Sequence, residues 1–265
     1  MLYPRTAATG TGNNIVSLRA GGLIMEQPRK TILVTGASSG IGRAITTLLL
    51  EQGYRVTGVA RDFSKFPCHD QHFTAVSMDL SDLDKLPGQL EDLIRNEPLI
   101  EGVVCCAGSG RFGSLEEFSC AQIRSLLDLN LTSQICLVRT LLPGMKQRGS
   151  GNIIFMGSEA ALAGGKRGAI YSAAKFGLRG LAQALRQECA ASGLRISIIN
   201  PGMVKTGFFD ELDFRPGETT DNYILPEDVA RAALLILEAR EGTVFDEINL
   251  SPQKKVIRFP KPGED

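Results

Sequence analysis

Thr35-Gly36-Ala37-Ser38-Ser39-Gly40-Ile41-Gly42 lies between two contrasting sequence patterns. The run before it ends at Thr31–Thr35 (TILVT), which is short, β-rich and apolar throughout, as expected of a strand covered on both faces. The residues after it repeat an apolar stripe at helical spacing, formed by Ile41, Ala44, Ile45, Leu48 and Leu49, and Gly53 is placed to end that helix. We therefore predict a strand, a glycine-rich turn and a helix.

The glycines of this turn point to a bound nucleotide. Backbone N–H groups at a helix start attract a diphosphate, and glycines let the main chain approach its oxygens without a Cβ in the way. Glycines and serines alone are also typical of an ordinary turn. A turn that follows a buried strand and opens an amphipathic helix is, however, the context that nucleotide binding requires.

Beyond this unit, strand-length apolar runs alternate with helix-period segments almost to the end of the chain. Strands are expected at Arg55–Ala60, Phe73–Met78, Gly102–Ala107, Asn152–Met156, Arg195–Ile199 and Glu247–Leu250. Helices are expected near Leu83–Ile94, Cys120–Lys146, Ala169–Ala191 and Pro226–Ala239. This alternation predicts an α/β fold: a single-domain, Rossmann-like, doubly wound parallel sheet of about seven strands with helices on both faces.

The chain of 265 residues fits one large α/β domain. We place the Rossmann-like domain at residues 28–252, after a disordered leader (1–27) and before a C-terminal tail (253–265). The first 24 residues contain Arg5 and Arg19 but no acid, so a weak organelle transit peptide is the alternative for the leader.

Composition excludes several classes of partner. Lys+Arg and Asp+Glu both total 29, so no net field favours nucleic acid or an anionic membrane. No apolar stretch approaches the roughly 18–20 residues of a membrane-spanning helix. The six cysteines form no CxxC pair and are expected to be buried, reduced thiols, with disulfides as the alternative: Cys68, Cys105, Cys106, Cys120, Cys136 and Cys189. We expect a cytoplasmic protein with no nucleic-acid or membrane partner.

The two histidines lie in one polar segment. His69 and His72 are neighbours of Cys68 and Asp70, and we expect a solvated loop there rather than a metal site. With so few histidines, a Ser–His–acid hydrolase is also disfavoured.

The glycine turn and the order of the elements together resemble a known protein family. TGASSGIG resembles the TGxxxGxG fingerprint of the short-chain dehydrogenase/reductase family, in its compact branch, and the resemblance extends from roughly Pro28 to Ser251. It implies an oxidoreductase with a nicotinamide cofactor. The residues that it assigns to the cofactor in this region are Gly36, Ser38, Ser39, Gly40, Ile41, Gly42, Asp79 (toward the adenine ring), Ala107 and Gly108.

The end of the second strand indicates which cofactor is used. An acid there would bind the ribose hydroxyls and repel a 2′-phosphate. This chain instead has Ala60 followed by Arg61, and a guanidinium beside a small residue suits a phosphate dianion. Arg43 could add a second positive charge, whereas Asp62 either pairs with Arg61 or points away. We expect NADP(H) rather than NAD(H).

Tyr171-Ser172-Ala173-Ala174-Lys175 places Tyr171 and Lys175 on one helix face. Hydride transfer to or from a carbonyl carbon requires a proton to move at the oxygen. A free tyrosine has a pKa of about 10, and a nearby ammonium with the positive nicotinamide ring would favour its phenolate. By itself this spacing is also typical of an ordinary surface pair.

The resemblance supplies the other members of the site. It implies that Ser158, directly after a strand and 13 residues before Tyr171, holds the substrate oxygen, and that Asn130 holds a water leading to Lys175. It also implies that Pro201, Gly202, Val204 and Thr206 lie beside the nicotinamide, and that Tyr171 and Lys175 contact the cofactor too. The catalytic set is Asn130, Ser158, Tyr171 and Lys175, and its spacing favours reduction of a carbonyl over reduction of a C=C bond.

One departure concerns Cys105-Cys106-Ala107-Gly108, where the family has Asn-Asn-Ala-Gly. Cys105 is a much weaker hydrogen-bonding partner than the family's sheet-bracing asparagine, which puts stability and cofactor fit in doubt. A redox role for the adjacent thiols is the outside alternative.

The segment Gly207–Tyr223 corresponds to the family's mobile lid. It carries Phe208, Phe209, Leu212, Phe214 and Tyr223, which predicts an apolar or mixed substrate, although these side chains could instead fill the core or an interface. Arg111, Phe112, Glu159 and Lys166 are further candidates for the pocket edge.

The resemblance also implies a homodimer or homotetramer formed through the long helices. Two alternative functions stay open: an NAD(H)-linked alcohol dehydrogenase, and a regulator that senses NADP(H) without turnover.

Overall fold

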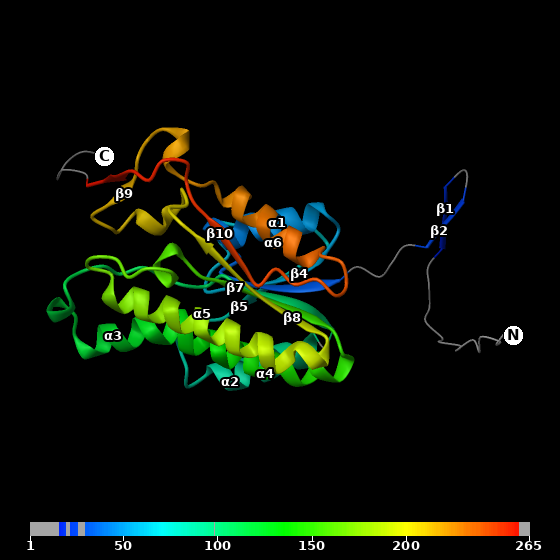
Figure 1. Cartoon of the computed structure of the whole chain (residues 1–265). Helices are drawn as coiled ribbons and strands as arrows, with labels where there is room; N and C mark the ends of the chain where they lie inside the picture. The colour runs from blue at the N-terminus through cyan, green and yellow to red at the C-terminus, as the bar shows by residue number, and fades with distance from the viewer. Residues whose placement is uncertain (1–15, 20–21, 26–29, 98, 260–265) are drawn as a thin grey trace, which may run out of the picture.

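The computed structural model describes residues 16–19, 22–25, 30–97 and 99–259. Its main sheet consists of seven parallel strands in the order β10-β8-β7-β6-β3-β4-β5 (Figure 1). The strands are β3 (Thr31–Thr35), β4 (Arg55–Ala60), β5 (Phe73–Ser77), β6 (Ile100–Cys105), β7 (Gly151–Met156), β8 (Leu194–Pro201) and β10 (Glu247–Leu250). The predicted doubly wound, Rossmann-like fold is confirmed. The strand order reverses between β3 and β6, the point where such sheets bind ligands.

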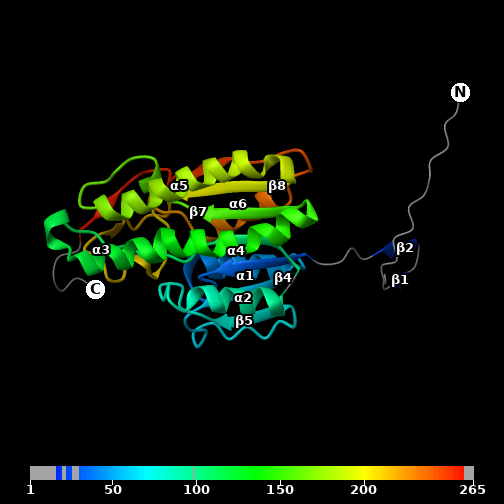
Figure 2. The same cartoon turned by 90° about the horizontal axis from the view of Figure 1, so that it is seen from below.

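Helices cover both faces of this sheet. Helices α1 (Gly40–Glu51) and α6 (Pro226–Leu237) lie together on one face, and α2 (Leu86–Asn96), α4 (Ser133–Arg148) and α5 (Ala169–Cys189) lie on the other (Figures 1 and 2). Alternation within β3 explains the two layers. Ile32 and Val34 pack with α1 and α6, whereas Leu33 between them packs with α2, α4 and α5.

The long helix predicted over Cys120–Lys146 is wrong in one respect, because it is interrupted. The structure has α3 (Cys120–Leu127), a five-residue π-helical turn (Asp128–Thr132) and then α4. The backbone N–H of Ser133 bonds to the carbonyl of Asp128, five residues back, and this widened turn is typical of π-bulges at functional sites. Periodicity alone does not distinguish such a turn from continuous α-helix.

The two terminal segments contain more structure than expected. Within the leader, β1 (Val16–Arg19) and β2 (Gly22–Met25) pair antiparallel, in keeping with the aliphatic residues of both runs; the rest of residues 1–29 lies outside the described part. In the tail, β11 (Ile257–Arg258) pairs antiparallel with β9 (Arg215–Pro216), which belongs to the expected lid. The tail is therefore attached to the lid segment up to residue 259.

Two further findings concern the described residues. No helix among them has both the length and the hydropathy that crossing a bilayer demands. All six cysteines are free, and Cys120 is exposed, so the prediction that the thiols are buried is wrong for that residue. Cys120 opens α3 at the surface, where its exposure follows from its position in the first turn.

Candidate active site

The glycine turn between β3 and α1 has the shape of an anion cradle. Gly36 and Gly40 have φ of 67° and 51°, values that residues with a Cβ rarely adopt. A Cβ at Gly42 would lie 2.3 Å from the carbonyl oxygen of Gly36. The side chain of Ser39 does not cap α1, and the first turn of the helix carries no acid. The positive end of α1 is therefore suited to a diphosphate.

Loops from the far half of the chain pack on this turn. A Cβ at Gly36 would lie 3.2 Å from Cα of Ala107, and one at Gly40 would lie 3.4 Å from the methyl group of Thr206. The loops after β6 and β8 thus meet the turn at the carboxyl end of the sheet. This meeting places the predicted diphosphate and nicotinamide residues around one space.

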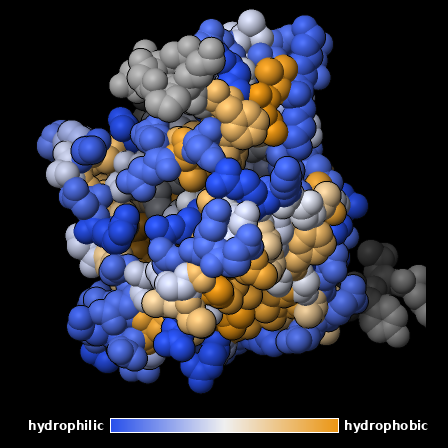
Figure 3. Space-filling model, turned by 90° about the vertical axis from the view of Figure 1, so that its left-hand side faces the viewer, coloured by the Kyte–Doolittle hydropathy of each residue, from blue (hydrophilic) through white to orange (hydrophobic). Residues whose placement is uncertain are grey.

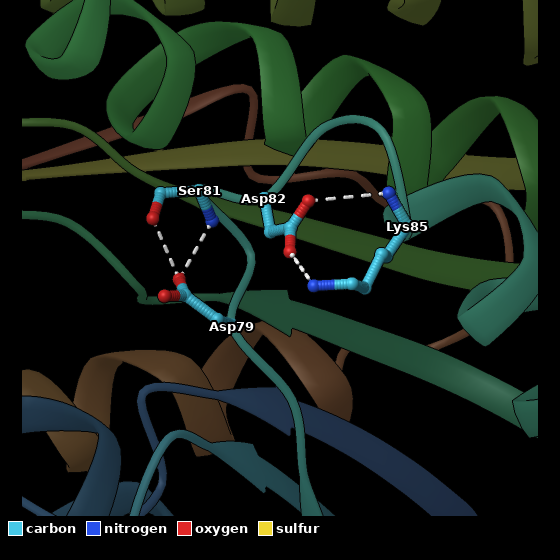
Figure 4. A network of polar contacts seen from close by, with 4 residues as sticks. All are labelled: Asp79, Ser81, Asp82 and Lys85. Atoms are coloured by element: carbon cyan, nitrogen blue, oxygen red, sulfur yellow. Dashed lines mark hydrogen bonds and ion pairs between the residues drawn. The ribbon is translucent and has the colours of Figure 1, made fainter.

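The predicted adenosine end lies after β4 and β5. Asp79 accepts hydrogen bonds from the hydroxyl (2.6 Å) and the backbone N–H (2.9 Å) of Ser81 (Figure 4), and both bonds lower its pKa. The charge of Arg61 lowers this pKa further. Asp62 accepts bonds from the N–H and hydroxyl of Ser64. Asp62 is therefore engaged by Ser64 rather than by Arg61, which is the second of the two alternatives predicted for it.

Arg43 lies beside this end of the site. Its guanidinium carbon is 5.1 Å from the ring centre of Phe66, and it donates a long hydrogen bond (3.5 Å) to the carbonyl of Lys65. Arg61 is exposed. Two guanidinium groups therefore border the segment that follows β4.

Gln134 is a residue that the sequence reasoning missed. It is 1% exposed, and its amide donates to the carbonyl of Ala107 at 3.1 Å, while the hydroxyl of Thr35 accepts the Ala107 N–H at 3.0 Å. Both backbone groups of Ala107 are therefore fixed. The strand β6 ends at Cys105 rather than at the predicted Ala107, because Ala107 bonds to these two side chains. Gln134 is the second residue of α4, and a glutamine beside the apolar residues that follow it is only a weak sequence signal.

Cys105 is buried and Cys106 is partly buried, and both thiols are protonated. Burial raises the pKa of Cys105 far above its usual range and raises that of Cys106 to about 12, although the charge of Lys175 acts in the opposite direction on Cys106. Protonated, enclosed thiols are weak nucleophiles. Elsewhere in the described part of the chain, no three His, Cys, Asp or Glu side chains gather as metal ligands would, and the segment around His72 forms turns with Asp70.

Asn130 lies in the π-turn between α3 and α4. It is 1% exposed, and its Nδ2 donates to the carbonyls of Ser109 and Leu126, both at 3.0 Å. Its Oδ1 has no partner among the described residues. A Cβ at Gly108 would lie 2.7 Å from this oxygen and 3.7 Å from Nζ of Lys175. The missing side chain of Gly108 leaves space between the amide and the ammonium.

Tyr171, Lys175 and Ser158 come together from two elements. Tyr171 and Lys175 lie one turn apart in α5 and are 8% and 6% exposed. Nζ of Lys175 donates to the carbonyl of Met156 at 2.9 Å and lies 5.6 Å from the centre of the Tyr171 ring. Ser158 follows β7, two residues after that carbonyl, and its hydroxyl lies close enough to the phenol of Tyr171 to lower the pKa of that phenol.

Burial moves the two titrating groups in opposite directions. It raises the pKa of Tyr171 to about 12, partly offset by the Ser158 hydroxyl, and it lowers that of Lys175 to about 8. The charge of Glu159 also raises the pKa of Tyr171, so the phenol is neutral in the protein alone. Stabilisation of the phenolate by Lys175 together with the nicotinamide ring stays a prediction. In this state Tyr171 is a proton donor.

The nicotinamide-side residues line the loop after β8. Pro201 ends the strand, and the N–H of Gly202 bonds to the carbonyl of Leu250 at 2.8 Å. Val204 forms a parallel bridge with Ile224. The hydroxyl of Thr206 accepts the N–H of Phe208 at 3.2 Å, so the cofactor loop continues directly into the lid.

The lid segment places aromatic rings over Tyr171. The rings of Phe112 and Phe208 lie 5.3 and 6.0 Å from that of Tyr171, and Phe214 lies 4.9 Å from Phe112. The five apolar lid residues named above are all partly exposed, which fits a lid better than a core. The end of the molecule that carries α3 and β9 shows hydrophobic areas among hydrophilic residues (Figure 3).

Of the four residues predicted to lie at the pocket edge, two lie beside the site and two are exposed. Phe112 contacts Tyr171, and Glu159 follows Ser158 and pairs with Lys255 of the tail at 2.8 Å. Arg111 and Lys166 are exposed. The sequence reasoning also missed Arg167, which has a left-handed φ of 60°, accepts the N–H of Gly113 and pairs with Asp213 at 2.8 Å.

Comparison with known proteins gives consistent matches. The short chain dehydrogenase family model matches residues 30–215. An uncharacterised oxidoreductase of Staphylococcus saprophyticus is 27% identical over 237 residues, which cover 86% of this chain and 100% of that protein. The 3-dehydrosphinganine reductase of Danio rerio is 31% identical over 83% of this chain and 72% of its own length. A solved oxidoreductase of the same family from Burkholderia thailandensis superposes with a TM-score of 0.73 at 29% identity, covering 84% and 92% of the two chains.

Proposed function

Because the chain belongs to the short-chain dehydrogenase family of oxidoreductases, we propose that it transfers hydride between NADP(H) and a carbonyl or alcohol carbon. Tyr171 is the general acid and base of this reaction. The observation that carries the proposal is the convergence of Ser158, Tyr171 and Lys175, in which the Ser158 hydroxyl acts on the phenol and Nζ of Lys175 lies 5.6 Å from its ring centre.

The glycine turn, the segments after β4 to β6 and the loop after β8 would hold the cofactor. The residues are Gly36, Ser38, Ser39, Gly40, Ile41, Gly42, Arg61, Asp79, Ala107, Gly108, Tyr171, Lys175, Pro201, Gly202, Val204 and Thr206. The fit rests on the positive φ of Gly36 and Gly40 and on the uncapped start of α1, where a side chain would block a diphosphate. When bound, the cofactor supplies or accepts the hydride.

The remaining chemistry belongs to the side chains. The neutral phenol of Tyr171 donates its proton to the substrate oxygen, and Ser158 holds that oxygen beside it. The ammonium of Lys175 stabilises the phenolate that results, at low dielectric where charge acts strongly. Asn130 directs its unpartnered Oδ1 toward the space beside Lys175, where a water would carry the replacing proton.

The preference for NADP(H) is supported by the charges after β4. Arg61 is exposed and acts on Asp79, Arg43 lies against Phe66, and the carboxylate of Asp62 is engaged by Ser64. Strand β4 ends at Ala60, so the position from which an acid would repel a 2′-phosphate carries no carboxylate.

The substrate class is supported by the rings over Tyr171. Phe112 and Phe208 present carbon surface to the phenol, which favours a carbonyl compound with an apolar body. A relative named 3-dehydrosphinganine reductase is consistent with the reductive direction.

A homodimer or homotetramer is part of the proposal. Helices α4 and α5 expose Ile135 (39%) and Phe176 (43%), and apolar side chains on neighbouring long helices suit a symmetric interface.

The decisive experiment is an NADPH-oxidation screen across ketones, aldehydes, quinones and 3-oxoacyl compounds, with Tyr171→Phe as the test variant. Tyr171→Phe should abolish turnover and retain NADPH binding in a fluorescence titration. Tyr54→Phe, at a tyrosine between α1 and β4, is the matched control and should retain activity. Activity that survives in Tyr171→Phe contradicts the assignment. NADPH binding without turnover of any compound by the unmodified protein would support a sensing regulator instead.

A further inference from the structure

Gly110 and Phe208 fit together in the loop above Tyr171. A Cβ at Gly110 would lie 2.3 Å from Cζ and 2.9 Å from Cε1 of Phe208, distances that atoms do not reach without a shift. The φ of Gly110 lies outside the left-handed region, so an alanine would suit its backbone. Glycine is therefore needed at this position for space, and the space is filled by the Phe208 ring.

Phe112 lies on the other side of this space at Gly110, which we call the Gly110 notch. Its Cε2 lies 2.9 Å from the Cβ position of Gly110, and its ring edge lies 3.4 Å from that of Gly168. Both phenylalanines contact the ring of Tyr171 and leave it 8% exposed. Two rings thus cover the lid side of the reacting phenol. Their position depends on the absence of a side chain at Gly110.

Further contacts hold Phe208 in this position. Its N–H bonds to the hydroxyl of Thr206, and its ring packs edge-on against Phe209 at 5.2 Å. Phe209 in turn contacts Phe214, which contacts Phe259 of the tail at 6.5 Å. The ring above Tyr171 is therefore the inner end of a series of rings that reaches the C-terminal strand.

We propose that the Gly110–Phe208 pair is the specificity determinant of this site, which admits slender or flat apolar carbonyl compounds and rejects those branched next to the carbonyl. The inference rests on the proposed function. A ring seated in the Gly110 notch leaves little room beside the hydroxyls of Ser158 and Tyr171, so bulk near the reacting carbon must displace it.

The first test measures kcat/KM with NADPH over methyl ketones whose second substituent grows from linear alkyl to phenyl to tert-butyl. Phe208→Ala should raise the kcat/KM for the branched ketone relative to the linear one by about tenfold or more. Phe245→Ala removes an identical, partly buried side chain that packs on the α1 and α6 side of the sheet, away from Phe208, and it should leave this ratio within about twofold of the original. An unchanged ratio in Phe208→Ala overturns the proposal.

The second test concerns the notch itself. Gly110→Ala should displace Phe208 and shift the same ratio, whereas Gly164→Ala, where no atom lies within 4 Å of the added Cβ, should not. In the double variant Gly110→Ala/Phe208→Ala, the alanine at 110 should add nothing to the effect of the alanine at 208. Fully additive effects would contradict the pairing.

A third readout does not depend on turnover and therefore separates this inference from the proposed function. The chain contains no tryptophan, so Phe208→Trp provides a single tryptophan that can be excited at wavelengths where the four tyrosines do not absorb. Its emission should shift to the red and become more accessible to acrylamide when Gly110→Ala is added, but not when Gly164→Ala is added. Equal emission and equal quenching in all three proteins would contradict the contact between Gly110 and the ring at position 208, even if the enzyme reduces ketones.

Discussion

Nζ of Lys175 lies 5.6 Å from the ring centre of Tyr171, one helical turn away, and both groups are buried. Enclosure raises the pKa of the phenol to about 12 and lowers that of the amine to about 8. Burial thus favours the neutral form of each group, whereas the proposed reaction requires the charged forms for part of its cycle. Stability and catalysis are therefore in conflict at this pair, and this conflict can be measured.

Lys175→Met should stabilise the protein at pH 7 while abolishing turnover. The pKa of Lys175 is lower in the folded protein than its ordinary value of 10.5, so the unfolded chain binds more protons between pH 8 and 10.5. The unmodified protein therefore gains stability as pH rises through this window, by about 3 kcal/mol. Denaturant unfolding of both proteins at pH 7 and pH 10 should show the advantage of Lys175→Met shrinking. Parallel curves would contradict a depressed pKa.

The rate of carbonyl reduction should fall above pH about 8. Lys175 loses its proton there, while Tyr171 keeps its own to about 12, so the lost group is the ammonium that stabilises the developing phenolate. The measurement is kcat/KM for a ketone with NADPH between pH 6 and 10. Lys175→Arg keeps a permanent charge, so the activity that this variant retains should not fall above pH about 8. A fall in kcat/KM at the same pH in that variant would show that another group titrates there.

Arg61→Ala should weaken NADPH far more than NADH. The guanidinium is exposed and close enough to Asp79 to influence its carboxylate, so its loss should raise KM for NADPH by about tenfold and leave KM for NADH nearly unchanged. Arg95→Ala, at an exposed arginine paired with Asp92 in α2, is the control. A similar rise for both cofactors would show that Arg61 does not read the 2′-phosphate.

Ending the chain after Pro252 should raise KM for the ketone several-fold with little change in melting temperature. The tail pairs β11 with β9, and Lys254 binds Asp221 at 2.7 Å, so its removal loosens the lid rather than the core. A chain that ends at Phe259 retains these contacts and serves as the control. An unchanged KM would show that the lid holds its position without the tail.

The sequence was sufficient for features that arise from neighbouring residues. A helix places residues four apart on one face, so Tyr171 and Lys175 could be paired without a structure. The turn from Thr35 to Gly42 was readable because a strand period changes to a helix period across it. The doubly wound parallel architecture also followed, because alternating strands and helices have few permitted arrangements, whereas the strand order came from the structure.

Only the tertiary structure decided features that depend on distant segments. The π-turn at Asn130 interrupts a periodicity that looks continuous, and the fixing of Ala107 by Gln134 joins residues 27 positions apart. The depth of Phe208 over Gly110 depends on side-chain volume across two loops. The pKa shifts at Tyr171 and Lys175 arise from the removal of water by all the groups around them. Local periodicity encodes which residues share a face, whereas enclosure is a property of the packed chain.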